Sequence, residues 1–171
     1  MIARAKELKR SERNKLNSLV RGVYLDKEGD LFSSYLLRYP TGVVTLTTAL
    51  SYYSIIDSWI DVPYDLSFQI GYRPICDKNI RQFKDKKEIL FLGVLQKHYE
   101  GIAFNIYDKE RLLIELWRKE KYLSKDIYKQ AIFYYRNLAN NGNLNIPLLK
   151  QYLSFMPKSN IYLKRLSLEV L

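Results

Sequence analysis

The stretch that decides the fold runs from a glycine turn through a strand into a helix. It reads Gly101-Ile102-Ala103-Phe104-Asn105-Ile106-Tyr107-Asp108-Lys109-Glu110-Arg111-Leu112-Leu113-Ile114-Glu115-Leu116. Residues 101–106 are apolar and follow a Glu-Gly turn, which predicts a β-strand. Asp108 is a suitable helix N-cap, and the leucines behind it, together with Trp117, lie at helical spacing. Strand and helix therefore alternate here within one short segment.

Working outward, the chain predicts an α+β fold in two parts. Residues 1–30 are expected to form a winged-helix remnant, with a basic helix over 2–13 and a β-hairpin of strands at 15–20 and 22–25. Residues 31–171 are expected to form a small β-sheet flanked by helices, followed by a helical C-terminal tail. Predicted helices cover 31–39, 47–55, 108–117, 124–139, 146–155 and 161–171, and predicted strands cover 66–70, 80–83, 89–92 and 101–106. Predicted caps are Asp30, either Thr47 or Thr48, Asp108 and Ser124.

Composition limits the class of protein. Of the 171 residues, 47% are apolar, which is enough to build a core. Apolar runs stay well below the ~18 residues that span a bilayer, and the charged N-terminus does not resemble a secretory signal. Cys76 is a lone cysteine, so it forms no internal disulfide. We therefore expect a cytoplasmic protein with no membrane partner.

Positive charge is concentrated at the N-terminus. Residues 1–22 carry seven basic and two acidic side chains, a net charge of +5 that is half of the +10 of the whole chain. Such a segment favours polyanions, because phosphate contacts release counterions; a solvated basic helix without a partner is the alternative. The candidate DNA-binding residues are Arg4, Lys6, Lys9, Arg10, Arg13, Lys15 and Arg21.

The sequence lacks the motifs of a catalytic or cofactor site. His98 and Cys76 are the single histidine and cysteine, too few for a zinc site, and no glycine-rich phosphate loop is present. Asp57, Asp61 and Asp65 are spaced by four, but Pro63 interrupts any helix that would align them. Asp65 with Asp85-Lys86-Lys87 gives a weak third interpretation, a metal-dependent nuclease. We expect no cofactor, no metal and no enzymatic activity.

Three stretches taken together resemble the AbiEi family of type IV antitoxins. They are residues 15–25, residues 44–53 and residues 101–116, and their order and spacing match over nearly the whole chain. Members of that family are bacterial transcriptional repressors that also neutralise a nucleotidyltransferase-like toxin. The resemblance implies an antitoxin and DNA-binding repressor of a toxin–antitoxin system for phage abortive infection. Duplex operator DNA and a cognate toxin are the implied partners, and the toxin need not be contacted directly.

The family motifs fall on particular residues. Lys15-Leu16 and Arg21-Gly22-Val23-Tyr24 match the segment that follows the recognition helix, and Glu110-Arg111 matches the family's Glu-Arg pair. Glu115 replaces the Asp that the family has five residues after that Glu. We interpret Gly22, Tyr24, Glu110, Arg111 and Glu115 as structural, with Arg111 and Glu115 able to pair one helical turn apart. Typical members carry two more helices before the recognition helix, where this chain begins. The alternative is therefore a non-catalytic interaction protein that keeps the antitoxin domain but has lost DNA binding.

Overall fold

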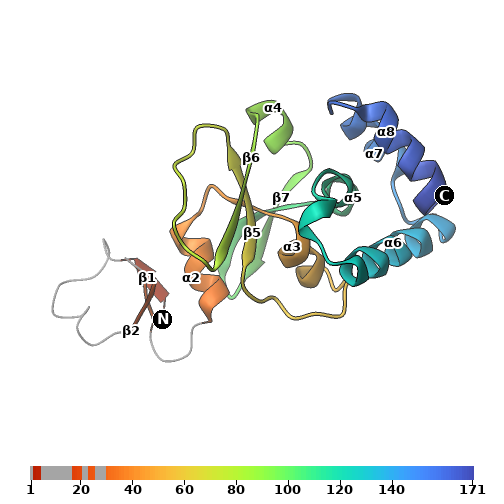
Figure 1. Cartoon of the computed structure of the whole chain (residues 1–171). Coiled ribbons are helices and arrows are strands. Elements are labelled where there is room, and N and C mark those ends of the chain that lie inside the picture. The colour runs from red at the N-terminus through yellow and green to blue at the C-terminus, as the bar shows by residue number, and fades with distance from the viewer. Residues whose placement is uncertain (1, 5–16, 21–22, 26–29) are drawn as a thin grey trace. The chain divides into compact units, whose positions relative to one another are not determined.

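The computed structural model describes residues 2–4, 17–20, 23–25 and 30–171. Contacts divide the chain into two compact units. The first holds the described residues up to 42 together with 96–105, and the second holds residues 43–95 and 106–171 (Figure 1). The predicted boundary between residues 30 and 31 stays a prediction.

The first unit contains a three-stranded antiparallel sheet of strands β1 (Ile2–Arg4), β2 (Asn17–Val20) and β3 (Val23–Leu25), in the order β1-β3-β2. The β2–β3 hairpin confirms the two predicted strands. The predicted helix over 2–13 is wrong at its start, because residues 2–4 pair with β3. The apolar spacing of three residues could not distinguish a strand from a helix here, because hydrogen bonds between strands satisfy the backbone as well as those of a helical turn do. Residues 5–13 lie outside the described residues.

Helix α2 (Leu31–Arg38) confirms both the predicted helix and its cap. Asp30 accepts a hydrogen bond from the backbone of Ser33 at 2.6 Å, which satisfies a free amide of the first turn. The other carboxylate oxygen of Asp30 accepts from the hydroxyl of Tyr99 at 2.5 Å. Phe32 packs edge-on against the rings of Tyr99 and Phe104, so the helix is held to the hairpin that contains them.

A mixed sheet of five strands confirms the α+β class. Its strands are β4 (Val43–Val44), β5 (Tyr64–Gln69), β6 (Ile80–Asp85), β7 (Val94–Tyr99) and β8 (Ile102–Tyr107), in the order β6-β5-β4-β8-β7. Strands β4 and β5 are antiparallel, whereas β5 and β6 are parallel. Side chains of β5 from Tyr64 to Phe68 are all buried, which identifies a central strand covered on both faces.

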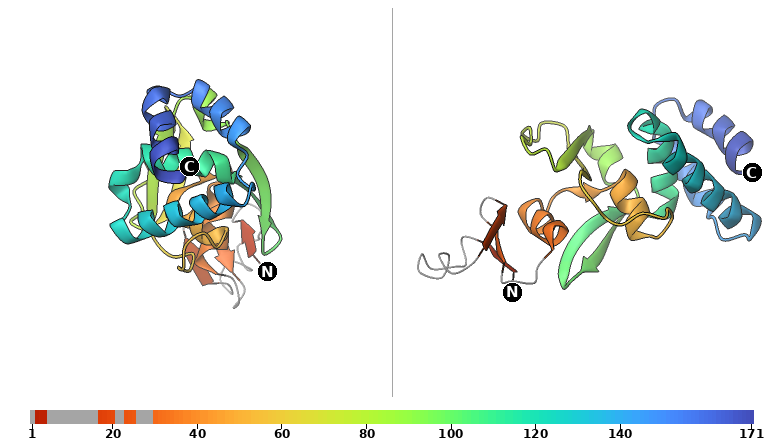
Figure 2. Two further views of the ribbon diagram at one scale, coloured as in Figure 1. Left: turned by 90° about the vertical axis from the view of Figure 1, so that its right-hand side faces the viewer. Right: turned by 60° about the horizontal axis from the view of Figure 1, so that its bottom comes forward.

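The second unit is completed by helices α3 (Leu46–Tyr52), α4 (Lys87–Leu90), α5 (Lys109–Arg118), α6 (Lys125–Asn140), α7 (Ile146–Ser154) and α8 (Ser159–Arg165). A 3-10 turn η1 (Glu120–Tyr122) precedes α6, and a π-helical segment η2 (Leu166–Val170) follows α8. Helix α5 lies between strands β5 and β6 and the group α6, α7 and α8 (Figures 1 and 2). Of the described helices, none is long and apolar enough to cross a membrane.

Helix α5 is the centre of the core. Every side chain from Arg111 to Trp117 is buried, and Leu112, Leu113 and Leu116 have no exposed surface. A helix buried on all sides is expected only where other elements surround it. Asp108 accepts from the backbone of Arg111 at 2.7 Å, and Ser124 accepts from that of Ile127 at 3.2 Å, so both predicted caps are confirmed.

Several other predictions in the second unit need correction. The predicted third strand over 89–92 is wrong, because residues 89 and 90 belong to helix α4. The strand β7 that follows was missed because its polar residues hide the alternation. The cap of α3 is Thr45 rather than Thr47 or Thr48. Thr47 and Thr48 instead bond to Asp65 on β5. The last helix starts at Ser159 and widens into a π-helical segment at Leu166.

Candidate functional site

The candidate DNA-binding residues are described only in part. Arg4 lies in β1 opposite Val23, and Tyr24 of the family motif lies in β3 opposite Ala3 and Ser18. The remaining candidate DNA-binding residues lie outside the described residues; they are Lys6, Lys9, Arg10, Arg13, Lys15 and Arg21. Gly22 of the family motif lies outside them as well.

The second family motif lies on helix α5. Of its three charged residues, Glu110 contacts helix α7, whereas Arg111 and Glu115 contact each other. Glu110 accepts a hydrogen bond from the backbone of Asn145 at 3.0 Å, and so joins α5 to the start of α7. Arg111 and Glu115 form the predicted ion pair one turn apart, with no exposed surface on either side chain. The pairing is therefore confirmed, but it is a core contact and not a surface one.

Gly93 fixes where the start of α5 lies. Its carbonyl accepts from the backbone of Asp108 at 2.7 Å, and its φ of +68° is a conformation that favours glycine. A Cβ atom at this position would come within 2.6 Å of the Cβ of Arg111. The missing side chain therefore lets the loop approach the helix closely enough to seat Arg111 in the core.

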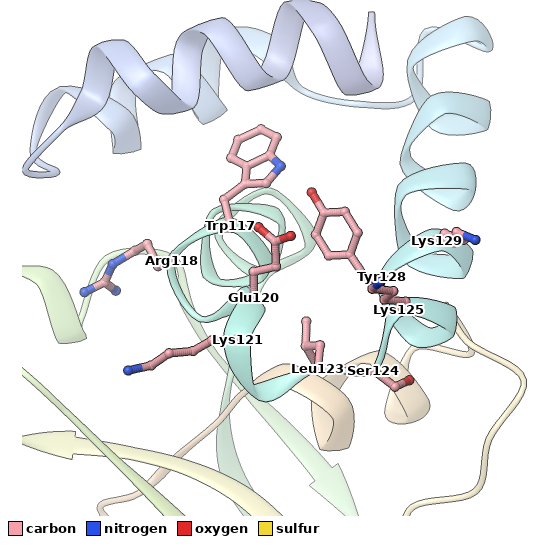
Figure 3. Close-up of a pocket in the computed structure, with 9 residues that line it drawn as sticks. All are labelled: Trp117, Arg118, Glu120, Lys121, Leu123, Ser124, Lys125, Tyr128 and Lys129. Atoms are coloured by element: carbon pink, nitrogen blue, oxygen red, sulfur yellow. The ribbon is translucent and has the colours of Figure 1, made fainter.

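A pocket of about 580 Å³ opens where α5 ends and α6 begins (Figure 3). Its lining comes from one continuous piece of chain between Trp117 and Lys129, with the 3-10 turn η1 in the middle. The side chain of Glu120 rises toward the rings of Trp117 and Tyr128 (Figure 3). Sequence reasoning did not identify this pocket, because no known motif occurs in the segment that forms it.

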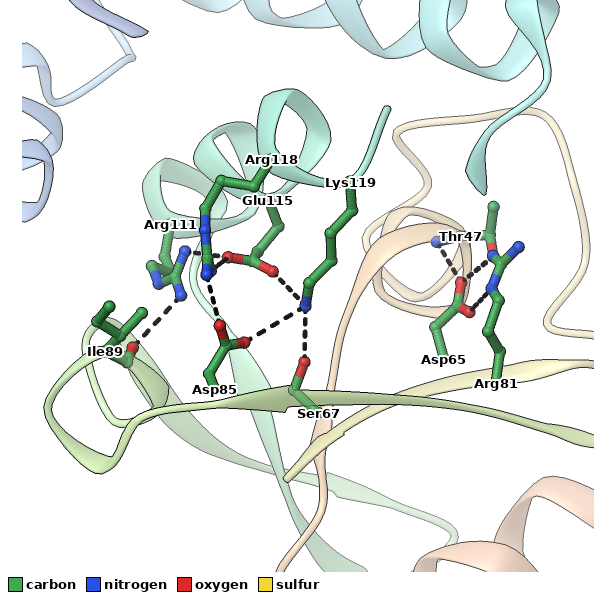
Figure 4. A network of polar contacts seen from close by, with 10 residues as sticks. All are labelled: Thr47, Asp65, Ser67, Arg81, Asp85, Ile89, Arg111, Glu115, Arg118 and Lys119. Atoms are coloured by element: carbon green, nitrogen blue, oxygen red, sulfur yellow. Dashed lines mark hydrogen bonds and ion pairs between the residues drawn. The ribbon is translucent and has the colours of Figure 1, made fainter. Parts of the chain in front are cut away.

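Five charged side chains meet between α5 and the sheet, and we call them the α5 charge network (Figure 4). Its members are Asp85, Arg111, Glu115, Arg118 and Lys119. Glu115 pairs with Arg111, with Arg118 and with Lys119, the last at 2.5 Å. Asp85 of β6 pairs with Arg118 at 2.5 Å and with Lys119 at 3.5 Å. The two carboxylates thus join helix α5 to strand β6.

The network has three cations against two carboxylates, and neutral groups offset the surplus. The guanidinium of Arg111 lies 4.5 Å from the ring centre of Tyr107, and its Nη2 donates to the carbonyl of Ile89 at 3.3 Å. The ammonium of Lys119 lies 4.3 Å from the ring centre of Phe83 and donates to Ser67 at 3.0 Å. Ring faces and carbonyl oxygens attract cations, so each buried cation has compensation.

The protonation of the network follows from these contacts. Burial by itself raises the pKa of Glu115, but Lys119, Arg111 and Arg118 outweigh burial and hold that pKa well below its usual range. Burial lowers the pKa of Arg118, whereas Glu115 and Asp85 raise it, and the net change is upward. Both groups are therefore charged at neutral pH. Burial, and then the Glu115 carboxylate, raise the pKa of Tyr107, which keeps its phenol neutral.

The Lys119–Ser67 contact has the residue types of a serine–lysine pair, but its surroundings oppose nucleophilic chemistry. A lysine that activates a serine must be neutral. Lys119 is instead paired with two carboxylates, and Ser67 has no exposed surface from which to meet a substrate. We interpret the pair as a structural contact.

A second ion pair, between a buried aspartate and a partly exposed arginine, joins strands β5 and β6. Arg81 of β6 binds Asp65 of β5 through two nitrogens, at 2.5 Å and 2.8 Å (Figure 4). Its third nitrogen donates to the carbonyl of Tyr122 at 2.8 Å. In the parallel register Asp65 faces Arg81, whereas Asp85 faces Gln69. The two aspartates are thus four residues apart, about 13 Å along the strands.

This separation bears on the nuclease interpretation. Asp65 and Asp85 are too far apart to share one metal ion, whose oxygen ligands lie within about 2.6 Å of it. Asp57 and Asp61 are exposed in the loop before β5. Within the part of the chain that the structure describes, no three His, Cys, Asp or Glu side chains form a group that could hold a metal ion.

Sequence reasoning missed two members of the network, Arg118 and Lys119. Arg118 and Lys119 follow Glu115 by three and four residues, so all three side chains lie on the same side of the helix. This spacing was the sequence signal; burial of the charges depends on packing of α5 against β6, which the helix sequence alone does not show. No protein-family model and no curated protein sequence matches the chain.

Proposed function

We propose that this chain is an antitoxin and a DNA-binding transcriptional repressor of a type IV toxin–antitoxin system. The observation that carries the proposal is the charge of residues 1–22, whose net +5 lies in a segment that resembles a recognition helix and its wing. The antiparallel pairing of β2 with β3 supports the hairpin that a wing requires. The target is duplex operator DNA, and a cytoplasmic location belongs to the same proposal.

The neutralising half of the function is assigned to residues 31–171, which contain the second and third stretches of the resemblance. The motif residues Arg111 and Glu115 support a scaffold role there, because they form an ion pair inside the core. The implied partner is a nucleotidyltransferase-like toxin encoded beside this chain. Stable contact with that toxin is not required.

Removing the basic side chains from the N-terminal segment is expected to abolish DNA retardation. The variant replaces Lys6, Lys9, Arg10 and Arg13 with alanine in the full chain, and the probe is the duplex upstream of its own reading frame. For each phosphate neutralised, the logarithm of the binding constant falls by about 0.9 per log unit of salt, so binding by the unaltered chain should weaken steeply with salt. Gel retardation over a salt series measures both effects.

The matched control changes four exposed lysines outside this segment to alanine, namely Lys78, Lys84, Lys150 and Lys164. It removes the same charge and should retain retardation. Equal loss in both variants would assign binding to net charge alone. Unchanged retardation by the first variant would favour the alternative function, an interaction protein without DNA binding.

A further inference from the structure

The pocket at the end of α5 has the dimensions of a ligand site. Its volume of about 580 Å³ lies inside the range of ~300–1,000 Å³ that small-molecule sites occupy. All of its lining residues belong to the second unit and to one segment of chain. The ion pairs of the α5 charge network do not fill the pocket.

One wall of the pocket is aromatic and held in place. Trp117 is only 4% exposed, and its ring stacks on that of Tyr162 at 6.3 Å. The guanidinium of Arg165 lies 5.6 Å from the ring centre of Tyr128. Neither Tyr162 nor Arg165 lines the pocket, so both rings are covered outside it. The wall is therefore preorganised, and its open part is contributed mainly by the half-buried Tyr128.

A single carboxylate, that of Glu169, fixes the polar ends of both rings. It accepts from the indole nitrogen of Trp117 at 3.1 Å and also from the hydroxyl of Tyr128. Arg165 in turn pairs with Glu169 and with Glu120, each at 2.8 Å. One oxygen of Glu120 is bound to Arg165, and Figure 3 shows its carboxylate directed between the two rings.

Once the ion pairs of its lining residues are taken into account, the pocket has a net positive charge. Arg118 is compensated by Asp85 and Glu115. Three exposed lysines of the lining have no ion pair with any residue that the structure describes: Lys121, Lys125 and Lys129. Lys125 is in the first turn of α6, where the helix dipole is unfavourable to a cation and favourable to an anion. Lys121 also lies 4.9 Å from the ring centre of Tyr122. An aromatic wall beside three lysines that have no ion pair is complementary to an aromatic anion.

We propose that this pocket binds a nucleotide. The base packs against Tyr128 and the edge of Trp117, and the phosphates lie on Lys125 at the start of α6. Lys121 and Lys129 point to opposite sides of the rim in Figure 3, and these exposed side chains turn toward the phosphates when the ligand binds. Glu120 accepts a hydrogen bond from a donor on the base, since a carboxylate offers only acceptors. A free nucleoside triphosphate and one unit of a single-stranded nucleic acid present this same chemistry. The site stands apart from the proposed antitoxin role and from the basic N-terminal segment.

Fluorescence of Trp117 gives a direct test in the full chain. The second tryptophan, Trp59, is 92% exposed, so Trp59→Phe removes its signal without touching the core. This protein is titrated with each of the four ribonucleoside triphosphates, with inorganic tripolyphosphate and with a short single-stranded oligonucleotide. At least one nucleotide should change the emission. Tripolyphosphate should bind about tenfold more weakly, because it has no base to stack.

A second test reverses the charge of two exposed lysines that line the pocket. Lys121→Glu with Lys125→Glu should weaken nucleotide binding about tenfold or more, since charge-assisted phosphate contacts are lost. Both positions are exposed, so the fold should persist, and circular dichroism checks this. The matched control, Lys150→Glu with Lys164→Glu, makes the same charge change at exposed positions outside the pocket and should retain the affinity.

The titrations distinguish a free nucleotide from one unit of a single-stranded nucleic acid as the ligand. Binding of free nucleotides that compete with the oligonucleotide assigns the site to a free nucleotide, and binding of the oligonucleotide alone assigns it to a unit of a strand. The proposal is overturned if neither probe binds or if tripolyphosphate binds as tightly as the nucleotides. It is also overturned if the control pair loses as much affinity as the rim pair.

Discussion

Replacing Glu115 with glutamine is expected to lower the free energy of unfolding by about 3–5 kcal/mol. Glu115 has no exposed surface and pairs with Arg111, Arg118 and Lys119. Without its charge, Arg111, Arg118 and Lys119 face Asp85 alone, and a buried charge without a partner is costly. Chemical denaturation followed by circular dichroism measures the loss.

Two further variants make this prediction specific to the network. Glu88→Gln makes the same change at an exposed position of α4 and should leave stability within about 0.5 kcal/mol. Adding Lys119→Met to Glu115→Gln restores the original balance of one excess positive charge, and should recover part of the loss. A loss below about 1 kcal/mol for Glu115→Gln would contradict the network as a determinant of stability.

The ionisation of Glu115 makes the free energy of unfolding depend on pH. Its folded pKa is lowered from the ordinary value of 4.5, so its contribution is fully present above that pH. It is lost as the pH falls below 4.5 toward the folded pKa, because the unfolded chain takes up the proton first. The unaltered chain should therefore lose stability more steeply in this acid window than Glu115→Gln does.

Replacing Leu116 with aspartate is expected to unfold the second unit. Leu116 has no exposed surface and lies in the middle of α5, the helix around which that unit packs. The change removes a large apolar side chain, at about 2–5 kcal/mol, and buries an unpaired carboxyl group as well. Together these approach the whole stability of a typical domain, about 5–15 kcal/mol.

Leu168→Asp is the matched control, because Leu168 is 70% exposed in η2. It should retain the circular dichroism spectrum and the cooperative unfolding transition that Leu116→Asp loses. A cooperative transition near that of the unaltered chain in Leu116→Asp would show that α5 is not the centre of the core.

The parts of the fold that could be predicted were those with a local physical signal. Asp30, Asp108 and Ser124 begin helices because their side chains bind free amides of the first turn, which a sequence shows directly. Helix α4 could not be predicted because its apolar residues fit either period, and strand β7 could not because polar residues hide its alternation. Strand β1 depends on pairing with β3, a contact between residues about twenty positions apart.

The α5 charge network shows the same limit for a site. The Arg111–Glu115 pair was predictable, since it lies one turn apart on one helix. Asp85 joins that pair only because β6 is parallel to β5 and faces α5, and this topology is not local to any segment. Asp65 and Asp85 appeared related in the sequence, yet the register separates them and gives each a cation of its own.

Growth of cells that express the neighbouring toxin tests the central claim most directly. The full chain should restore growth, and so should its variant with Lys6, Lys9, Arg10 and Arg13 changed to alanine, because neutralisation is assigned to residues 31–171. Leu116→Asp should not restore growth, whereas Leu168→Asp should. Failure of the full chain to restore growth, with its circular dichroism and unfolding transition intact, would contradict the antitoxin function.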